Sequence, residues 1–299
     1  MTVTRITNLM LSQQMLANIT QGQQALAATQ EQMSTGKRIN QASDDPYGAG
    51  LAVTLKGQLA QLAGYSSNVS DGTAWTTAGL SAMSSISQQL QRAQELVVAA
   101  NNGTNSKADL QATAGEIDQL IEGIKSDADT QYNGQYVFSG TTTAPYDTTS
   151  NPPVDTPQGT YQDVTRVIGP SNANVTVNVS LSGVLDGSSG LIQTLRSISS
   201  DLKAGDTSNL SGDLKTMSDN LNSLGQAQAS LGSAAGRLTL ASTRLDTLQT
   251  NTTAALSDDQ DANVAATYTT FSNEQAAFTA ALKAGASIVQ TSLMDFLSN

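Results

Sequence analysis

The amino-acid sequence predicts a mainly α-helical fold: an elongated antiparallel helical bundle, or coiled-coil rod, with a small β insertion domain at its tip. Residues 47 to 100 contain no proline, and apolar side chains recur there at every seventh position, as in one long helix with a packing seam. A second proline-free stripe of leucines begins near residue 208 and reaches residue 248. The two stretches are natural antiparallel partners. The first seam consists of Leu55, Leu62, Val69, Met83, Leu90 and Val97, interrupted only by Thr76.

The length of the first stretch argues for an extended molecule. At about 1.5 Å per residue it would reach roughly 80 Å, whereas a compact chain of 299 residues has a radius of gyration of about 19 Å. Gly72 and Gly79 each cost about 1 kcal/mol relative to alanine inside a helix. We therefore expect this helix to need partners along its length.

Composition excludes several classes of function. The chain has 25 acidic against 14 basic residues, a net charge of −11, which argues against nucleic acid and anionic membranes as partners. It has no cysteine and no histidine, which removes thiol nucleophiles, imidazole bases and Cys/His metal sites. We expect no cofactor and no metal. The sequence shows neither a secretory signal peptide nor a membrane span, so we expect a soluble chain.

Three domains are predicted. Residues 1–43 with 258–299 form terminal helical arms that serve as an assembly domain. Residues 44–135 with 186–257 form the long-helix rod, which includes a third helix opened by a capping box at Ser106 and Asp109 and a further helix that resumes at Gly190. Residues 136–185 form the β-rich tip, because five of the six prolines fall between Pro145 and Pro170 beside strand-like stretches at 136–140, 161–168 and 174–181.

The arms carry heptad-spaced apolar residues, and glutamines occupy part of their seams. Such a seam suits either an intramolecular helix pair or helices that order against neighbouring subunits. Gln23, Gln30 and Gln275 bury too little apolar area to stabilise an isolated pair, so we favour the second interpretation. The residues predicted at the assembly interface are Leu9, Leu16, Ile19, Leu26, Met33, Tyr268, Phe271, Phe278, Leu282, Val289 and Phe296.

Three stretches resemble a known family. Met33-Ser-Thr-Gly-Lys-Arg-Ile-Asn40, followed by Ser43-Asp-Asp-Pro46, resembles the N-terminal link of the bacterial flagellin superfamily. Gln135-Tyr-Val-Phe-Ser-Gly-Thr141 and the ending Ser292-Leu-Met-Asp-Phe-Leu297 resemble its hook-filament junction branch, the hook-associated protein 3 family. The resemblance covers both helical arms and nearly the whole chain except residues 142 to 185.

The resemblance implies a secreted structural component of the bacterial flagellum. It would leave through the flagellar type III export machinery, with an export chaperone, and form a ring with other subunits of itself at the hook-filament junction. There it would join the first hook-associated protein to flagellin. A filament-forming flagellin is the alternative within the same superfamily.

Other kinds of site fit the sequence poorly. A carboxylate glycosidase would need two acidic residues at a cleft, and only Asp147, Asp155 and Asp163 lie in the predicted tip. The stretch 258–261 lacks the glycine and distal glutamate of a calcium loop, and Gly48-Ala-Gly50 is too short for a phosphate cradle. Lys37 and Arg38 are most simply solvated charges. We expect no enzyme.

Overall fold

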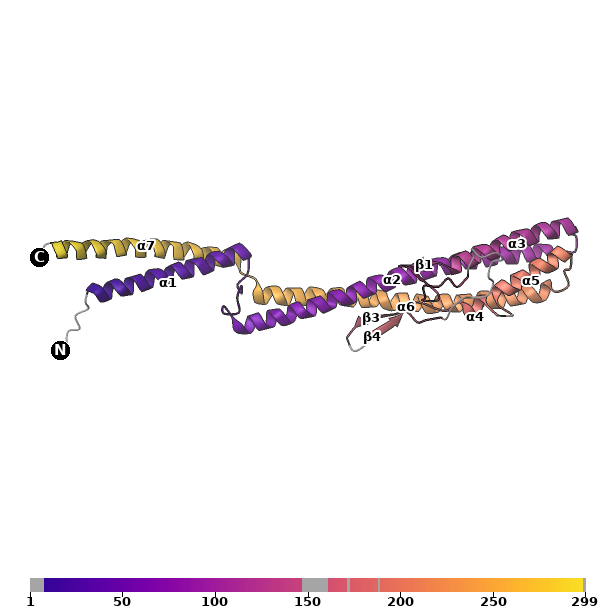
Figure 1. The fold of residues 1–299 in the computed structure, drawn as a ribbon, viewed down its shortest axis with the longest axis horizontal. Coiled ribbons are helices and arrows are strands. Elements are labelled where there is room, and N and C mark those ends of the chain that lie inside the picture. The colour runs from indigo at the N-terminus through magenta and orange to yellow at the C-terminus, as the bar shows by residue number, and fades with distance from the viewer. Residues whose placement is uncertain (1–7, 147–160, 171–172, 188, 298–299) are drawn as a thin grey trace. The chain divides into compact units, whose positions relative to one another are not determined.

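The computed structural model describes residues 8–146, 161–170, 173–187 and 189–297 (Figure 1). The chain divides into two compact units: unit 1 comprises Met1–Ala60 and Gln249–Asn299, and unit 2 comprises Gln61–Leu248. The three-domain division remains a prediction beside these two units. The elements in chain order are α1 (Asn8–Thr35), α2 (Pro46–Ala100), α3 (Lys107–Ala128), β1 (Gln131–Tyr132), β2 (Gln135–Tyr136), β3 (Thr165–Gly169), β4 (Ala173–Thr176), α4 (Ser182–Leu185), α5 (Leu191–Ala204), α6 (Leu210–Gln260) and α7 (Val264–Leu297).

The mainly α-helical fold is confirmed, and the heptads explain it. In unit 2, α2 and α6 pack antiparallel: Gly72 lies against Leu238, and Gly79 lies against Leu231, so the two numberings run in opposite directions. From Leu210 to Leu245, every seventh residue of α6 is buried, as the stripe predicts. These residues are Leu210, Met217, Leu224, Leu231, Leu238 and Leu245.

Two shorter helices, α3 and α5, complete the core of unit 2. The α3 capping box is present: the Ser106 side chain accepts a hydrogen bond from the Asp109 N–H, and the Asp109 carboxylate accepts one from the Ser106 N–H. Gly205 ends α5 with a left-handed φ of 84°. One apolar cluster joins α2, α3, α5 and α6, and Figure 1 shows these helices side by side.

Charged side chains connect α3 and α5 across their exposed edge, which the sequence analysis does not anticipate. The Lys203 Nζ atom lies 2.6 Å from Asp118 Oδ2, and the Ser199 hydroxyl donates to Asp118 Oδ1 at 2.7 Å. Arg196 donates to Glu122 Oε1 at 2.9 Å. Burial alone would raise the pKa of Asp118, but the hydrogen bonds from Lys203 and Ser199 outweigh it and hold that pKa below its usual value.

The strands form two small antiparallel pairs, β1 with β2 and β3 with β4. They are shorter than predicted: β2 ends at Tyr136, where a turn follows instead of a strand to residue 140, and β4 ends at Thr176 although the sequence alternates to Leu181. Of the loop expected at 144–159, residues 147–159 lie outside the described chain, while Tyr146 is buried at 3% exposure. The short helix α4 is not predicted by the sequence pattern.

The strands β1 to β4 and the residues beside them form a strand segment, which lies along the flank of α2 and α6. The sequence analysis expects this segment at the tip of the rod instead. Four of its valines share an apolar cluster with Val69 and Trp75 of α2 and with Leu238 and Leu245 of α6. Two-stranded pairs cannot form a core of their own, so Val175 of β4 and the three valines next to the strand ends are buried against the helices. The valines are Val137, Val164, Val175 and Val177.

Trp75 anchors the strand segment as well as the helices. It is fully buried, and its indole N–H donates to the Val137 carbonyl at 3.1 Å. The Arg166 guanidinium of β3 lies 5.6 Å above its ring and 2.5 Å from the Asp71 carboxylate of α2. The hairpin is thus fixed to α2 by an ion pair and a cation–π contact.

Two glycines of α2 provide a matched test of close packing. A Cβ at buried Gly79 would lie 2.8 Å from Leu231 Cδ2 and 3.1 Å from Val137 Cγ1, whereas nothing lies within 4 Å of one at Gly64. We expect Gly79→Val to lower the free energy of unfolding by about 1–3 kcal/mol through overpacking. Gly64→Ala should raise it by roughly 0.5–1 kcal/mol through helix propensity. Urea unfolding of both variants measures this; equal shifts would contradict the close approach of α2 and α6.

Asp186 provides a test of pH dependence. Partial burial raises its pKa, although the Tyr146 hydroxyl donates a hydrogen bond to its Oδ1 atom. Because the pKa of Asp186 is higher in the folded than in the unfolded chain, Asp186 contributes fully to stability at pH values below its unfolded pKa. This contribution is lost as the pH rises through the folded pKa. Asp186→Asn keeps the acceptor and removes the charge. We expect its stability gain over wild type to be larger at about pH 7 than at about pH 3, on either side of the ordinary aspartate pKa of about 3.9.

Urea midpoints at the two pH values measure the difference. Asp219→Asn, which removes a carboxylate from an exposed i,i+4 pair with Lys215, controls for the loss of surface charge in the same unit. The same gain for Asp186→Asn at both pH values would show that burial does not perturb this carboxylate.

Candidate assembly interface

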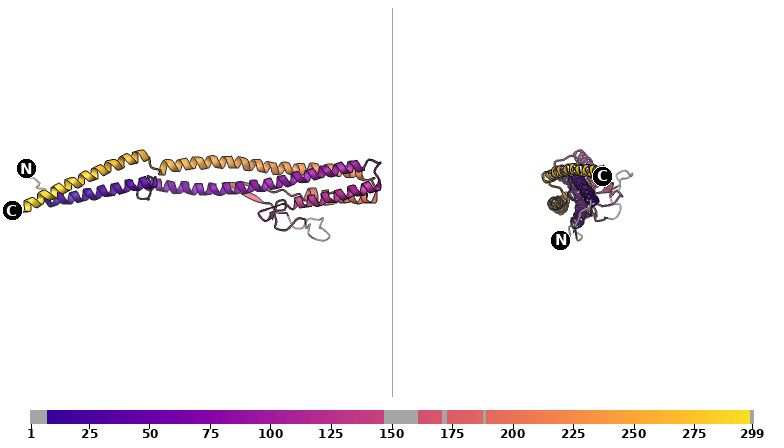
Figure 2. Two further views of the ribbon diagram at one scale, coloured as in Figure 1. Left: turned by 90° about the horizontal axis from the view of Figure 1, so that it is seen from above. Right: turned by 90° about the vertical axis from the view of Figure 1, so that its left-hand side faces the viewer.

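The two terminal helices pair with each other in unit 1, which is the intramolecular interpretation of their seams and not the one that the sequence analysis favours. In Figures 1 and 2, α1 and α7 run side by side, and their contacts show that they are antiparallel. A Cβ at Gly22 would lie 3.5 Å from Phe278 Cδ2, and one at Gly285 would lie 3.3 Å from Met15 Cε. Each glycine therefore gives a large side chain of the opposite helix room to approach the backbone.

The centre of this pair is polar. Thr29 of α1 is 7% exposed, and its hydroxyl lies 2.5 Å from Glu274 Oε2 of α7 and 3.0 Å from the Ala25 carbonyl oxygen. Thr267 of α7 is 9% exposed and donates to the Asn263 carbonyl at 3.0 Å. A polar seam was expected, but from other residues. Those residues, which are exposed here, are Gln23, Gln30 and Gln275.

The predicted interface residues fall into two groups on the described part of the arms. Ile19, Leu26, Phe271 and Phe278 are half-buried. Four others are exposed, with relative exposures from 37% to 63%. The exposed four are Leu16, Met33, Tyr268 and Leu282. The side chains of Leu9, Val289 and Phe296 lie outside the described residues, although their backbones belong to α1 and α7.

Unit 1 has almost no apolar core of its own. Of the buried apolar residues in the described chain, only Ile39 and Ala52 belong to it. The large exposed apolar residues show the opposite distribution: nine lie in unit 1 and five in unit 2, although unit 2 is the larger. This surplus of exposed apolar side chains in unit 1 is what helices that contact other chains would present. The nine are Met10, Leu16, Met33, Tyr47, Leu51, Val53, Val264, Tyr268 and Leu282.

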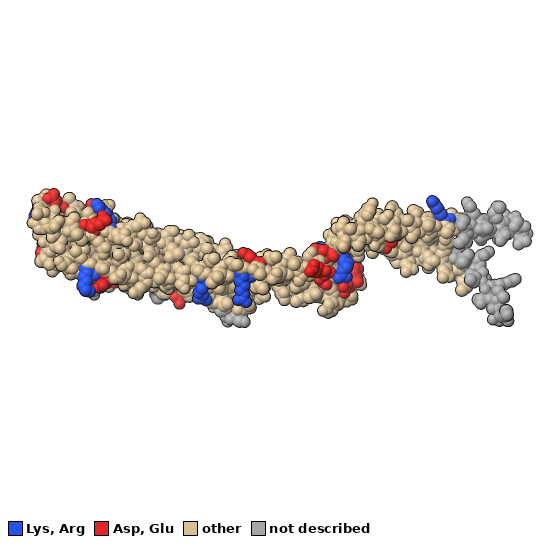
Figure 3. All heavy atoms as spheres, turned by 180° about the vertical axis from the view of Figure 1, so that it is seen from behind, with Lys and Arg blue, Asp and Glu red and all other residues tan. Residues whose placement is uncertain are grey.

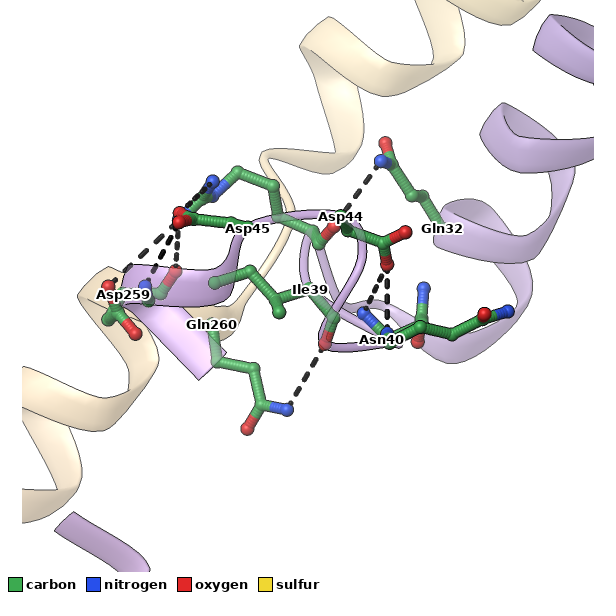
Figure 4. Close-up of polar contacts among 10 residues, drawn as sticks. Gln32, Ile39, Asn40, Asp44, Asp45, Asp259 and Gln260 are labelled. Atoms are coloured by element: carbon green, nitrogen blue, oxygen red, sulfur yellow. Dashed lines mark hydrogen bonds and ion pairs between the residues drawn. The ribbon is translucent and has the colours of Figure 1, made fainter. Parts of the chain in front are cut away.

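Two short links, residues 36–45 and 261–263, join the helices of unit 1 and contact each other (Figure 4). Gly36 ends α1 with a left-handed φ of 69°. Lys37 and Asp261 then form an isolated antiparallel bridge. The second link is short, because α6 continues to Gln260 and only three residues separate it from α7.

Arg38 is bound rather than merely solvated, which corrects the simplest interpretation of its charge. Its Nη1 atom lies 3.2 Å from Asp45 Oδ2, and its Nη2 atom donates to the Asp259 carbonyl at 2.8 Å. The pKa of Asp45 is lowered, first by a hydrogen bond from the Gly48 N–H and then by Arg38. Figure 3 shows charged side chains gathered at the links and sparse over most of the surface on that side of the molecule.

The first link also contains a well-buried apolar side chain, Ile39. Ile39 is 3% exposed, and its carbonyl accepts a hydrogen bond from the buried Gln260 side chain at 3.2 Å. A Cβ at Gly48 would lie 2.5 Å from Ile39 Cδ1. Close packing against Ile39 therefore accounts for this glycine, in place of the rejected phosphate cradle.

A cavity of about 240 Å³ lies between the arms beside Arg38. Its lining mixes hydroxyl and amide groups with apolar surface from alanine and threonine side chains. Among the described residues, no group of three or more acidic side chains is arranged to hold a metal ion, and no helix is long and apolar enough to cross a membrane. The lining residues are Thr29, Gln32, Arg38, Ala262, Asn263, Ala266, Thr267 and Thr270.

Comparisons with known proteins agree with this arrangement of helices. The bacterial flagellin N-terminal helical region matches residues 6–143, and the bacterial flagellin C-terminal helical region matches residues 214–297. The chain is 40% identical over 125 residues to the phase 1 flagellin of Salmonella naestved and, equally, to a flagellin of Salmonella dublin. Each match spans 41% of this chain but only 24% of the relative's own length.

Three solved structures share the fold. A putative flagellar hook-associated protein from Vibrio parahaemolyticus matches with a TM-score of 0.65 and 18% identity, covering 73% of this chain and 100% of the other. FlgL of Bacillus cereus matches with a TM-score of 0.57 and 23% identity, over 70% and 99% of the two chains. FlgL of Xanthomonas campestris matches with a TM-score of 0.59 and 14% identity, over 68% and 99%. At these identities the likeness concerns the fold alone.

Proposed function

Because this chain belongs to the bacterial flagellin family, we propose that it is the adaptor between the flagellar hook and the filament. Proteins of this family are structural and not enzymes, in agreement with the expectation of a non-catalytic chain. In the proposed role, subunits of this chain form a ring whose arms contact the first hook-associated protein on one side and flagellin on the other. The subunits reach this position through the flagellar type III export machinery, with the help of an export chaperone.

The observation that carries this proposal is the unfilled apolar surface of unit 1. The α1–α7 pair buries one stripe of each helix but leaves Leu16, Tyr268 and Leu282 at 63%, 60% and 45% exposure. Residues of this kind at helical spacing are typical of helices that pack against further helices. Neighbouring subunits and the adjoining flagellar proteins would supply those helices.

Two features favour the adaptor over a filament-forming flagellin. The ending Ser292-Leu-Met-Asp-Phe-Leu297 resembles that of the junction branch. The structures that share the fold over two thirds of the chain or more include a putative flagellar hook-associated protein and FlgL, so the fold of this chain is compatible with the adaptor role. The identity to Salmonella flagellins keeps the filament-forming role as the second candidate.

Assembly on isolated hooks distinguishes the two roles. Purified chain should be added to hooks that already carry their first associated protein, and the products viewed by electron microscopy. An adaptor is expected to add one layer of constant thickness and then to allow flagellin to polymerise on it. Continued growth into filaments by this chain alone would favour the flagellin alternative and contradict the adaptor.

Leu282→Asp and Phe278→Asp separate assembly contacts from contacts inside the arm pair. Leu282 is 45% exposed, so its substitution should abolish subunit assembly while leaving the thermal unfolding of the monomer unchanged. Phe278 is half-buried against Gly22, so its substitution should also weaken the α1–α7 pair. Circular dichroism of the monomers and the hook assay measure the two effects.

Exposed Gln275→Asp, in the same helix, provides the control, because it adds a charge without removing an apolar side chain. Unimpaired assembly by Leu282→Asp would contradict the proposed interface. A loss of monomer helicity in Leu282→Asp as large as that in Phe278→Asp would instead place Leu282 inside the arm pair.

A further inference from the structure

We infer that the two links of unit 1 form a single clasp, closed by Arg38, so that neither link opens without the other. The links are residues 36–45, between α1 and α2, and residues 261–263, between α6 and α7. They lie more than two hundred positions apart in the sequence yet exchange main-chain and side-chain hydrogen bonds. This coupling is independent of whether the chain assembles at the junction or in the filament.

The main chain provides the first half of the clasp. The Arg38 N–H donates to the Gln260 carbonyl at 2.8 Å, and the Ala262 N–H donates to the Gly36 carbonyl at 2.9 Å. These two bonds flank the bridge between Lys37 and Asp261, which is therefore a non-hydrogen-bonded antiparallel pair. Opening either link breaks both bonds, because each bond has one partner in each link region.

Arg38 provides the second half, because its groups reach the end of α1, the residue before α2 and the end of α6. Its carbonyl accepts from Gln32 Nε2, near the end of α1, at 3.3 Å. Its guanidinium pairs with Asp45, immediately before α2, and donates to the Asp259 carbonyl, near the end of α6. In Figure 4, Asp45 and Asp259 lie close together on one side of the link, and Gln32 lies on the other side.

Arg38 lies among acidic side chains of both link regions. Asp44 and Asp45 belong to the first link, and Asp258, Asp259 and Asp261 lie at or beside the second. Two acidic segments repel each other at this distance unless a cation lies between them. The Arg38 side chain is half-exposed, so its ion pairs alone contribute little, and its main effect is to position the two links for their main-chain bonds.

The buried side of the clasp makes its opening cooperative. Gln260 donates its amide to the Ile39 carbonyl, and both residues are at least nine-tenths buried. Separating the links would expose Ile39 to water and leave the Gln260 amide without this acceptor. Separation of the links therefore carries both free-energy costs at once, whichever link moves first.

Engineered disulfide formation tests the clasp directly, because the chain has no cysteine of its own. Lys37→Cys with Asp261→Cys places two thiols on the bridged pair, and such pairs have the Cα separation that a disulfide requires. In dilute full-length chain we expect an intramolecular disulfide to form at least about tenfold faster than in the control Lys37→Cys with Asp258→Cys, because the bridged thiols have the higher effective concentration. The control thiol lies one helical turn earlier on α6.

Adding Arg38→Gln to the bridged pair should slow disulfide formation several-fold. Arg38→Lys should give an intermediate rate, since lysine keeps the charge but not the two-pronged geometry. The clasp is overturned if the bridged pair reacts no faster than the control pair, or if Arg38→Gln leaves its rate unchanged. As a control, unit 2 should still unfold cooperatively in each variant, which would show that the rest of the chain folds.

Hydrogen exchange in the cysteine-free chain supplies an independent measurement, because Asp261→Cys also removes a hydrogen bond from Ser257. In the Arg38→Gln variant, the backbone amides of residues 38 and 262 should lose protection from hydrogen exchange by the same factor. Lys37→Gln removes a neighbouring positive charge that makes no ion pair among the described residues, and it should lower the protection of neither amide. Loss of protection at Arg38 with Ala262 unchanged would show that the links open separately.

Discussion

The close approach of α2 and α6 is the constraint on which the fold of unit 2 depends. Gly72 and Gly79 make α2 a poor helix by itself, yet they admit Leu238 and Leu231 against its backbone. The helix propensity lost at each glycine, about 1 kcal/mol, is offset by burial of a leucine side chain, about 1.5–3 kcal/mol. With this pair in place, the other elements of unit 2 have an apolar surface to cover: α3 and α5 cover one part, and the valines of the strand segment cover another.

The sequence predicts the helices well because their apolar period is set by packing over many turns. The α6 stripe from Leu210 to Leu245 and the α5 face with Leu191, Leu195 and Ile198 are buried where the periodicity places them. Strand prediction is poorer, for a physical reason. From Val175 to Leu181, apolar and polar residues alternate because alternate side chains are buried. This pattern does not depend on whether the backbone pairs with another strand, so it continues beyond the end of β4 at Thr176.

The candidate site is less predictable from sequence. Heptad spacing identifies Leu16 and Leu282 as apolar positions, but it does not show that they stay exposed once α1 and α7 pair. Arg38 follows a lysine in a polar stretch, and no local pattern indicates that its partners lie near residue 259. Contacts between residues so distant in sequence depend on the fold as a whole. Only the resemblance of the surrounding motif to the flagellin family draws attention to this position beforehand.

The two units differ in whether they complete their own core. Unit 2 covers α2 and α6 with its own elements and holds nearly all the buried apolar residues of the described chain, whereas unit 1 pairs two long helices around a polar centre at Thr29 and Glu274. A helix pair buries only one stripe of each member, so the remaining apolar surface stays in water until another chain covers it. Unit 1 therefore gains more from association than from further folding. A clasp at its links suits this situation, because it keeps both arms together in the arrangement that a neighbouring subunit would meet.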